Sequence, residues 1–409
     1  MLVRCGFLGK TLRFDEAAEV LHVLRTVTEG WSLRKVSESE GDPEIGIRGQ
    51  GDGFQIEQPG RVPRGEPSAV SAACSLVASL LNCLVEDDSD LLALHAGAVT
   101  FGGQAVVFPS THRAGKSTLA AALAFQGHRL IAEDILPLDC NGAHISAIAS
   151  GVAPRLRLPI PLSLGIKFRL SAWRNAGPDD GYYRYLQLPS RSRCRFGERF
   201  GIGAFLFLER DARHREPRLF AVRRADAMRI LLLQNFGTAA PPAVILDRIE
   251  ALTDQCPAYL LRYSGLGKAV SFLEAAFGSQ ALVEPWPRLQ IASPDISRVA
   301  GVELEGRQAA ALVEKIICRR RHVTVRQMDG SAFLADQTGG GIFALDPLGR
   351  AIWELMKHPV STGEIAAGLC EAYPDIPPET IAADVSRLVE QFLENGLATD
   401  VGRSALRSA

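Results

Sequence analysis

The sequence has almost no net charge and no closely paired cysteines. Its 45 Lys and Arg residues against 46 Asp and Glu residues leave a net charge of −1. This balance excludes a nucleic-acid partner recognised through bulk positive charge. The eight cysteines are scattered without a C-x-x-C pair, which argues against a zinc site or a disulfide framework and fits a reducing compartment.

Long apolar runs are also missing. The first residues, MLVRCGFLGKTLRF, contain no apolar core long enough for a signal peptide. The longest weakly polar run, residues 69–85, is interrupted by serines and Asn82 and is short of a membrane span. We therefore expect a cytoplasmic protein without a membrane partner.

The length and composition indicate a globular protein of two or three domains. The chain has 409 residues, 47% of them hydrophobic and 22% charged, which is ordinary for a protein with packed cores. We expect an N-terminal α/β segment at 1–85 that packs on a domain at 86–278. The periodic spacing of apolar residues is lost after residue 278, so we place a linker at 279–314 and a second domain at 315–401. The N-terminal segment could be scaffold or could have a separate substrate role.

A strand, a loop and a helix around residue 115 predict a phosphate-binding P-loop. Ala105–Phe108 is a short apolar run typical of a buried strand, and Lys116–Phe125 is rich in Ala and Leu, as in a helix. Between them the loop ends in Gly-Lys-Ser-Thr, the pattern whose backbone N–H groups and helix N-terminus suit a polyphosphate. Lys116 would reach the β- and γ-phosphates, and the Ser117 hydroxyl would ligate Mg²⁺. The predicted nucleotide-binding residues are Ser110, Thr111, His112, Arg113, Ala114, Gly115, Lys116, Ser117 and Thr118.

The P-loop pattern departs from the standard one at Ser110, where a glycine is expected. Glycine tolerates positive φ and lets a phosphate come close, so a serine serves only with favourable backbone angles. The alternative is a chance Gly-Lys-Ser at the start of an ordinary helix.

Polar residues at two predicted strand ends favour the P-loop interpretation. His95 ends the apolar run Leu91–Leu94, and Glu133 with Asp134 closes the apolar strand Leu130–Ala132. In a doubly wound sheet, ligands bind beyond the carboxyl ends of the strands. An acid at such a position suits either Mg²⁺ coordination or a base for an attacking hydroxyl.

The segments HAG, AGKS and GHRLIAED at these spacings resemble the C-terminal kinase domain of HPr kinase/phosphorylase, and more closely its bacterial relatives, the HPr-kinase-like serine kinases. The resemblance implies an ATP- and Mg²⁺-dependent kinase of that α/β fold. Carried across, His95 precedes the P-loop, Lys116 and Ser117 hold phosphate and metal, and Asp134 is the catalytic aspartate that takes the proton from a substrate hydroxyl. Glu133 stands where the family has Asp, and we assign it to the metal.

The later glutamate-bearing signature of that family is not visible. SGVAPRLRLP occupies residues 150–159 instead, which weighs against HPr itself as the substrate and against the reverse phosphorolysis. Arg155 and Arg157 could stabilise transferring charge near a triphosphate or could be solvated arginines. Residues 177–199, polar, aromatic and rich in Arg, predict a long loop that could cover the site or meet a peptide.

The C-terminal module has the pattern of a winged helix with three strands and three helices. Strand signals at 322–327, 331–335 and 341–345 precede a helix capped by Asp346, with Pro347 at its first position. Ser361 and Glu364 form a capping box for a second helix. A third helix, 377–396, has a single apolar stripe.

The alternatives for this module are DNA binding, dimerisation and peptide capture. The charged residues of the third helix are mostly acidic, four acids against Arg387, which argues against a DNA reader. LDPLGRAIWELM, STGEI and DVSRLVEQFLENGL resemble the PqqD family, which captures leader peptides of ribosomally made natural products as an added strand. The resemblance implies these peptide-binding residues: Gly341, Ile342, Phe343, Ala344, Leu345, Asp384, Arg387, Leu388 and Gln391.

Together the two modules predict an ATP-dependent kinase that phosphorylates a Ser or Thr hydroxyl of a precursor peptide held by its leader, of lasso type in some relatives. Tethering would raise the concentration of the acceptor at the site. Two alternatives stay open: a regulatory serine kinase of the HPr type, and a nucleotide-binding scaffold that only presents the peptide to other enzymes. The partners expected are nucleotide and precursor peptide, and a homo-oligomer is left open.

Overall fold

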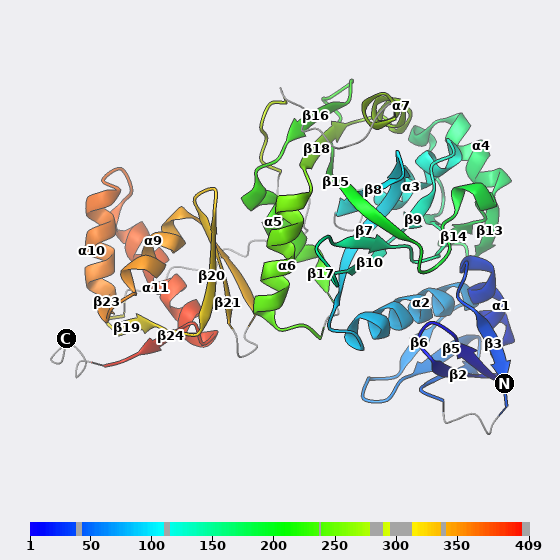
Figure 1. Cartoon of the computed structure of the whole chain (residues 1–409), viewed down its shortest axis with the longest axis horizontal. Helices are drawn as coiled ribbons and strands as arrows, with labels where there is room; N and C mark the ends of the chain where they lie inside the picture. Colours follow the sequence, from blue (N-terminus) through cyan, green and yellow to red (C-terminus); the bar gives the residue numbers. More distant parts are fainter. Residues whose placement is uncertain are drawn as a thin grey trace. The chain divides into compact units, whose positions relative to one another are not determined.

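The computed structural model describes residues 1–37, 43–109, 115–236, 239–278, 289–294, 313–336 and 341–402. The chain divides into two compact units: Met1–Ala239 with Leu252–Val302, and Ala240–Ala251 with Glu303–Ala409. Both are mixtures of helices and sheets (Figure 1).

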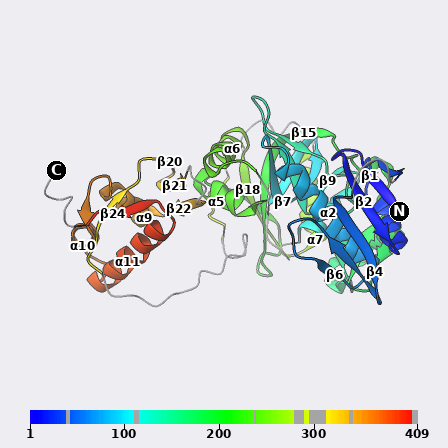
Figure 2. The ribbon, with the colours of Figure 1, turned by 90° about the horizontal axis from the view of Figure 1, so that it is seen from below.

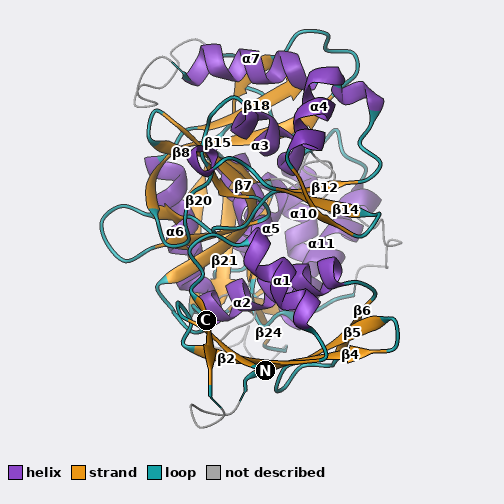
Figure 3. Cartoon of the chain, turned by 90° about the vertical axis from the view of Figure 1, so that its right-hand side faces the viewer, coloured by secondary structure: helices purple, strands orange, loops and turns teal. Residues whose placement is uncertain are grey.

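The first unit begins with a six-stranded sheet in the order β3-β1-β2-β4-β5-β6. Its strands are β1 (Leu2–Cys5), β2 (Lys10–Asp15), β3 (Leu33–Val36), β4 (Ile45–Gln50), β5 (Gly53–Glu57) and β6 (Arg64–Glu66). The helices α1 (Ala18–Val27) and α2 (Ala69–Glu86) lie on one face of this sheet (Figure 3). Val152 and Tyr185, from much later in the chain, complete the same core.

Helix α2 lies between the N-terminal sheet and the next one (Figure 2). Ser68 starts it with a capping box to Ser71, which satisfies two backbone donors at the helix start. Among the described residues, α2 is the one helix long and apolar enough, by length and composition, to cross a membrane. Its apolar side chains, such as Leu76 and Leu80, are fully buried in the core of the unit, as in the core helix of a globular domain.

A nine-stranded sheet forms the centre of this unit, in the order β11-β10-β7-β8-β15-β18-β16, with β9 and β17 both paired to β7. The strands are β7 (Leu91–Phe101), β8 (Gln104–Pro109), β9 (Leu130–Ala132), β10 (Ile135–Asp139), β11 (Ser146–Ile148), β15 (Arg199–Arg210), β16 (Arg218–Ala221), β17 (Asn235–Phe236) and β18 (Ala258–Tyr263). The helices of this unit include α3 (Lys116–Phe125), α5 (Arg224–Gln234) and α7 (Leu266–Phe277). Helix α6 (Pro242–Gln255) follows α5 in the chain, and its residues up to Ala251 belong to the second unit. α3 and α7 pack against β8, β15 and β18 in one apolar core.

The sheet is mixed rather than parallel, and this corrects the expected position of His95. β8, β15 and β18 are parallel, whereas β7 is antiparallel to both β8 and β10. His95 is therefore not at a strand end but within β7, where the strand changes partner from β10 to β8. The physical reason is that the apolar pattern continues past His95 through small buried residues, Ala96 and Ala98, so the strand does not stop.

The expected loop at 177–199 is also wrong in part. Residues 176–186 form a hairpin, β13 (Ala176–Asp179) and β14 (Tyr183–Leu186), and β12 (Arg155–Arg157) pairs with β14. The polar residues Asp179 to Gly181 end one strand and form the tight turn of the hairpin instead of opening a loop. Two short 3-10 turns, Leu162–Leu164 and Ser190–Ser192, and helix α4 (Ile166–Arg174) complete this region.

The second unit contains two three-stranded sheets, β20-β21-β22 and β23-β19-β24. Its strands are β19 (Ile316–Arg319), β20 (Val323–Met328), β21 (Ser331–Asp336), β22 (Ile342–Leu345), β23 (Val360–Ser361) and β24 (Ala398–Asp400), and its helices are α9 (Pro347–Leu355), α10 (Thr362–Ala372) and α11 (Pro378–Glu394). The predicted caps are present, because Asp346 accepts from Gly349 and Ser361 forms a capping box with Glu364. The sequence did not indicate β19, β23 and β24.

Candidate functional site

The start of α3 requires glycine at its first turn. Gly115 has φ of 97°, in the left-handed region that favours glycine. A Cβ at this position would lie 3.1 Å from the hydroxyl of Tyr263. No described side chain caps α3, and its first turn holds no acidic residue, so the N-terminal N–H groups suit an anion.

The predicted nucleotide-binding residues fall on both sides of the boundary of the described chain. Ser110, Thr111, His112, Arg113 and Ala114 lie outside the described residues. Gly115, Lys116, Ser117 and Thr118 form the start of α3, and the side chain of Lys116 is buried, with 5% exposure.

His95, Lys116 and Asp134 lie together beside the start of α3. The Nε2 atom of His95 is 2.7 Å from Oδ1 of Asp134 and 3.1 Å from Nζ of Lys116. β7 places His95 opposite Ile135, and the N–H of Ala96 donates to the Asp134 carbonyl oxygen at 2.9 Å. The three predicted catalytic side chains therefore meet in one cluster, although they come from three segments of the chain.

The proton on His95 decides which of its two contacts is a hydrogen bond. A protonated Nε2 donates to Asp134, whereas an unprotonated Nε2 accepts from the ammonium of Lys116. Burial alone would raise the pKa of Asp134, but the hydrogen bond from His95 and the nearby cations lower this pKa to about 2. Burial lowers the pKa of Lys116, against the attraction of the Asp134 and Glu133 carboxylates. Asp134 is thus an ionised carboxylate at neutral pH.

Glu133 is the second carboxylate of the site, and it is nearly inaccessible, with 7% exposure. The hydroxyl of Ser117 donates to it. Burial, together with the adjacent charge of Asp134, raises the pKa of Glu133 to about 7. The two neighbouring carboxylates therefore differ in charge below neutral pH, when Asp134 is ionised and Glu133 is protonated.

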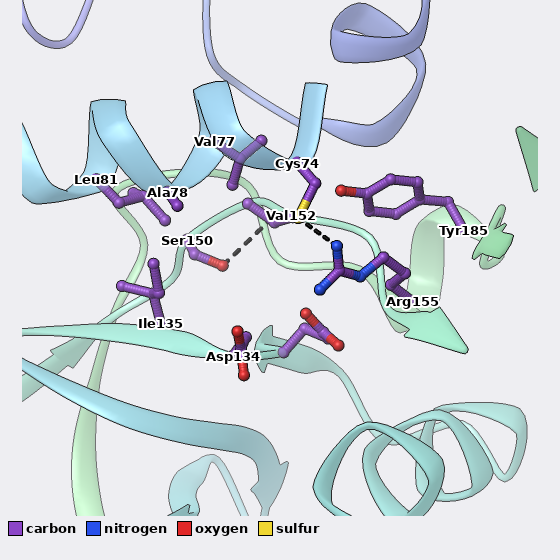
Figure 4. A pocket seen from close by; sticks show the side chains of 11 residues that line it. Cys74, Val77, Ala78, Leu81, Asp134, Ile135, Ser150, Val152, Arg155 and Tyr185 are labelled. Carbon is purple, nitrogen blue, oxygen red and sulfur yellow. Dashed lines mark hydrogen bonds between the residues drawn. The ribbon is translucent and has the colours of Figure 1, made fainter. Parts of the chain in front are cut away.

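Arg155 lies near the carboxylates of Glu133 and Asp134, on the side that faces helix α2. A small cavity of about 40 Å³ separates α2 from these residues (Figure 4). The guanidinium of Arg155 donates to the sulfur of Cys74, and its charge acts on both Glu133 and Asp134. The cavity has room for water and not for a nucleotide. Arg155 thus belongs to the buried side of the site, whereas Arg157 is exposed.

Glu133→Gln is expected to stabilise the ligand-free protein at alkaline pH. The folded pKa of Glu133 lies above its ordinary value of 4.5, so ionising it costs stability as the pH rises through this range, and the loss is complete above pH 7. We expect little change in the free energy of unfolding near pH 5 and a gain of about 2 kcal/mol at pH 8. Urea unfolding at both pH values, with a chelator present, measures this difference.

Glu198→Gln is the matched control for that measurement. Burial would raise the pKa of Glu198, but a backbone hydrogen bond and Arg129 lower it, so this carboxylate stabilises the fold where it is ionised. Its replacement should lower stability at pH 8, opposite in sign to the first variant. A Glu133→Gln protein with the same stability difference at pH 5 and pH 8 would show that Glu133 is solvated.

The donor set at Ser117 and Glu133 fits Mg²⁺. A hydroxyl and a carboxylate are oxygen donors, and Mg²⁺ at kinase sites takes one or two protein ligands, with water and phosphate oxygens as the others. Glu133 is also a buried carboxylate whose negative charge a cation would compensate. Within the described ranges, no three or more His, Cys, Asp or Glu side chains form a group that could hold a metal ion.

The predicted peptide-binding residues lie on β22 and α11 of the second unit. β22 is the last strand of its sheet, paired on one side to β21. Phe343 and Leu388 are half-buried at the margin of the core, and Arg387 forms an ion pair with Asp384 at 2.6 Å. Gln391 is exposed. The remaining predicted residues, Gly341, Ile342, Ala344 and Leu345, complete or precede the strand.

Comparisons with known proteins identify this second module. The family model described as "Coenzyme PQQ synthesis protein D (PqqD)" matches residues 331–398. These residues form a PqqD-like domain, a recognition element for ribosomally made peptides. A solved structure titled "TbiB1 in Complex with the TbiA(beta) Leader Peptide" has 24% sequence identity to this chain and a TM-score of 0.18. The match covers 20% of this chain and 93% of the chain in that structure. No curated protein matches the sequence.

Two residues beside the cluster of His95, Lys116 and Asp134 were not predicted as part of the site. Cys74 lies on α2 and meets Arg155 only through the tertiary fold. Gly97 was visible in the sequence as part of HAG, but its role is structural: a Cβ there would lie 3.3 Å from the Glu133 carbonyl oxygen and 3.6 Å from Cβ of Lys116. A residue with a side chain at 97 would therefore press against the Glu133 carbonyl oxygen and would be in ordinary van der Waals contact with Lys116.

Proposed function

We propose that the protein is an ATP-dependent kinase that phosphorylates a Ser or Thr hydroxyl of a ribosomally synthesised precursor peptide, whose leader binds the PqqD-like domain. One observation carries the kinase part of this proposal: His95 lies within hydrogen-bonding distance of both Lys116 and Asp134, at the N-terminus of a helix that follows a buried strand. That arrangement suits a triphosphate, a cation and an acceptor hydroxyl.

Each side chain has a distinct role in this reaction. The start of α3 and the ammonium of Lys116 would neutralise the β- and γ-phosphates, and Ser117 with Glu133 would hold Mg²⁺, which draws negative charge from the phosphates. Asp134 would accept the proton of the acceptor hydroxyl as its oxygen forms a bond to the γ-phosphorus. The bond from that phosphorus to the bridging oxygen breaks, and ADP leaves with the bonding electron pair.

The low pKa of Asp134 is compatible with this role. In a loose transition state for phosphoryl transfer the protein contributes mainly positioning and charge stabilisation. The hydrogen bond from His95 would orient the Asp134 carboxylate, and the acceptor proton need move only late in the reaction. A strongly basic residue is therefore not required.

The PqqD-like domain would supply the peptide. The outer edge of β22 has backbone groups that an extended leader could pair with, and Leu388 on α11 offers an apolar contact beside it. Capture there would hold the acceptor near the site at an effective concentration in the mM range for a short linker.

Mass spectrometry of a cognate precursor peptide tests the proposal. With the full-length protein, ATP and Mg²⁺, we expect the peptide to gain the mass of a phosphoryl group while ADP accumulates. The precursor is sought among short open reading frames beside this gene. A peptide that binds tightly and gains no mass would favour the scaffold alternative.

Leu388→Asp in the same assay separates capture from chemistry. A charge at this half-buried position should raise the KM for the full precursor about 10-fold or more, because the leader loses an apolar contact, with kcat nearly unchanged. Thr399→Asp adds the same charge to exposed β24 and should leave both constants unaltered.

A further inference from the structure

Helix α4 has an apolar stripe that faces away from the core. Phe168 and Ala172 are buried in the core of the central sheet. The side chains at helical spacing on the other face are exposed, together with one from the preceding turn. They are Leu162, Ile166, Leu170 and Trp173, with exposures of 76%, 73%, 41% and 69%. Large apolar side chains in a continuous exposed row mark a contact surface.

Unpaired cations surround this stripe. Residues 140–178 contain five Arg or Lys residues and no Asp or Glu. Arg155 is in the site described above, and the other four form no ion pair with any described residue, unlike Arg129, Arg193 and Arg199 of the same unit. These four are Arg157, Lys167, Arg169 and Arg174. We call them, with the apolar stripe, the α4 surface; it complements a partner that is both apolar and acidic.

A groove lies beside helix α4 and the segment that follows β12. It has a volume of about 430 Å³, and its walls include Leu158, Ile160, Arg169 and Trp173. The segment that supplies Leu158 follows β12 directly, and Arg155 at the start of β12 lines the cavity beside Asp134. Three residues of strand cover about 10 Å. An extended peptide in the groove could therefore place a hydroxyl near Asp134.

We propose that the α4 surface binds the segment of the precursor peptide that carries the acceptor hydroxyl, and that this segment combines apolar with acidic residues. The proposal rests on the proposed function. The groove favours a peptide over a lipid surface, because a flat bilayer would leave a hollow beside Trp173 unfilled. The short stretch of β12 between the groove and Arg155, whose charge acts on Asp134, favours the acceptor segment over a second copy of this chain.

Binding of two defined peptides tests this proposal without any need for catalysis. One is a fluorescein-labelled synthetic peptide that alternates Leu, Glu and Ser, without a leader, and the other has Lys in place of Glu. By fluorescence anisotropy with the full-length protein, the Glu peptide should bind at least about 10-fold more tightly. Equal binding of the two peptides would overturn the proposal.

Substitutions on the α4 surface locate the binding. Ile166→Ser with Trp173→Ser, and separately Arg169→Glu, should each weaken the Glu peptide about 10-fold or more. Leu233→Ser, at an apolar side chain of α5 with 44% exposure, is the control and should bind normally. Unchanged binding by both α4 variants would place the peptide elsewhere and overturn the assignment.

Two further measurements identify the partner of the α4 surface if it is not the peptide. Co-sedimentation with phosphatidylglycerol–phosphatidylcholine vesicles that is lost in the α4 variants would indicate a lipid surface. A doubled mass in light scattering, lost in the same variants, would indicate a second copy. Either result without peptide binding overturns the proposal. Because the peptide assay needs no ATP, an inactive kinase with normal Glu-peptide binding would refute only the proposed function.

Discussion

Lys116→Ala is expected to abolish phosphoryl transfer while peptide capture continues. The ammonium of Lys116 is 3.1 Å from His95 Nε2, at the first residue of α3, where a triphosphate would lie. Removing one fixed positive group from a transferring phosphoryl group costs about 10³-fold or more in rate. The time course of phosphate gain on the precursor peptide measures the loss, and leader affinity is followed separately by anisotropy.

Lys268→Ala is the matched control, because Lys268 is a half-exposed lysine on α7 that pairs with Glu216. It should keep full activity. The Lys116 variant must also remain folded, which a thermal unfolding curve checks. If it loses leader affinity as strongly as activity, then the division of labour between the P-loop region and the PqqD-like domain is wrong.

The sequence predicted the local elements of the site well, because their signals are local. The apolar run of β8 and the Ala- and Leu-rich pattern of α3 needed no tertiary information, and the observed α3 spans the predicted Lys116–Phe125. The caps at Asp346 and Ser361 were visible for the same reason. Short polar residues at a helix start act on backbone groups within three positions.

Long-range arrangement was less accessible. The strand with His95 was ended too early because a single polar residue in an apolar run looks like a boundary. The hairpin β13–β14 was missed because its stability comes from pairing with β12 and not from its own pattern. The contact of Arg155 with Cys74 joins residues 81 positions apart. No periodicity in either segment indicates such a contact.

Asp134→Asn is expected to remove most of the transfer and to keep nucleotide affinity near normal. The substitution keeps the shape of the side chain, and it removes both the acceptor for the hydroxyl proton and the charge that orients His95. The loss of one positioned base is typically 10²- to 10⁴-fold in rate. Asp139→Asn, at the far end of β10 in an ion pair with Arg199, is the same chemical change away from the cluster and should leave kcat unaltered.

The pH profile separates Asp134 from its neighbours. Because its pKa is lowered to about 2, Asp134 stays ionised throughout the range from pH 5 to 9 and should contribute no inflection there. Glu133, with a pKa of about 7, should lose its proton within that range, and kcat/KM for Mg²⁺-ATP should rise as it becomes a better oxygen ligand. If Asp134→Asn keeps activity, then Asp134 is not the base. The base would then be Glu133 or His95, and the larger loss of kcat in Glu133→Gln or in His95→Gln would indicate which.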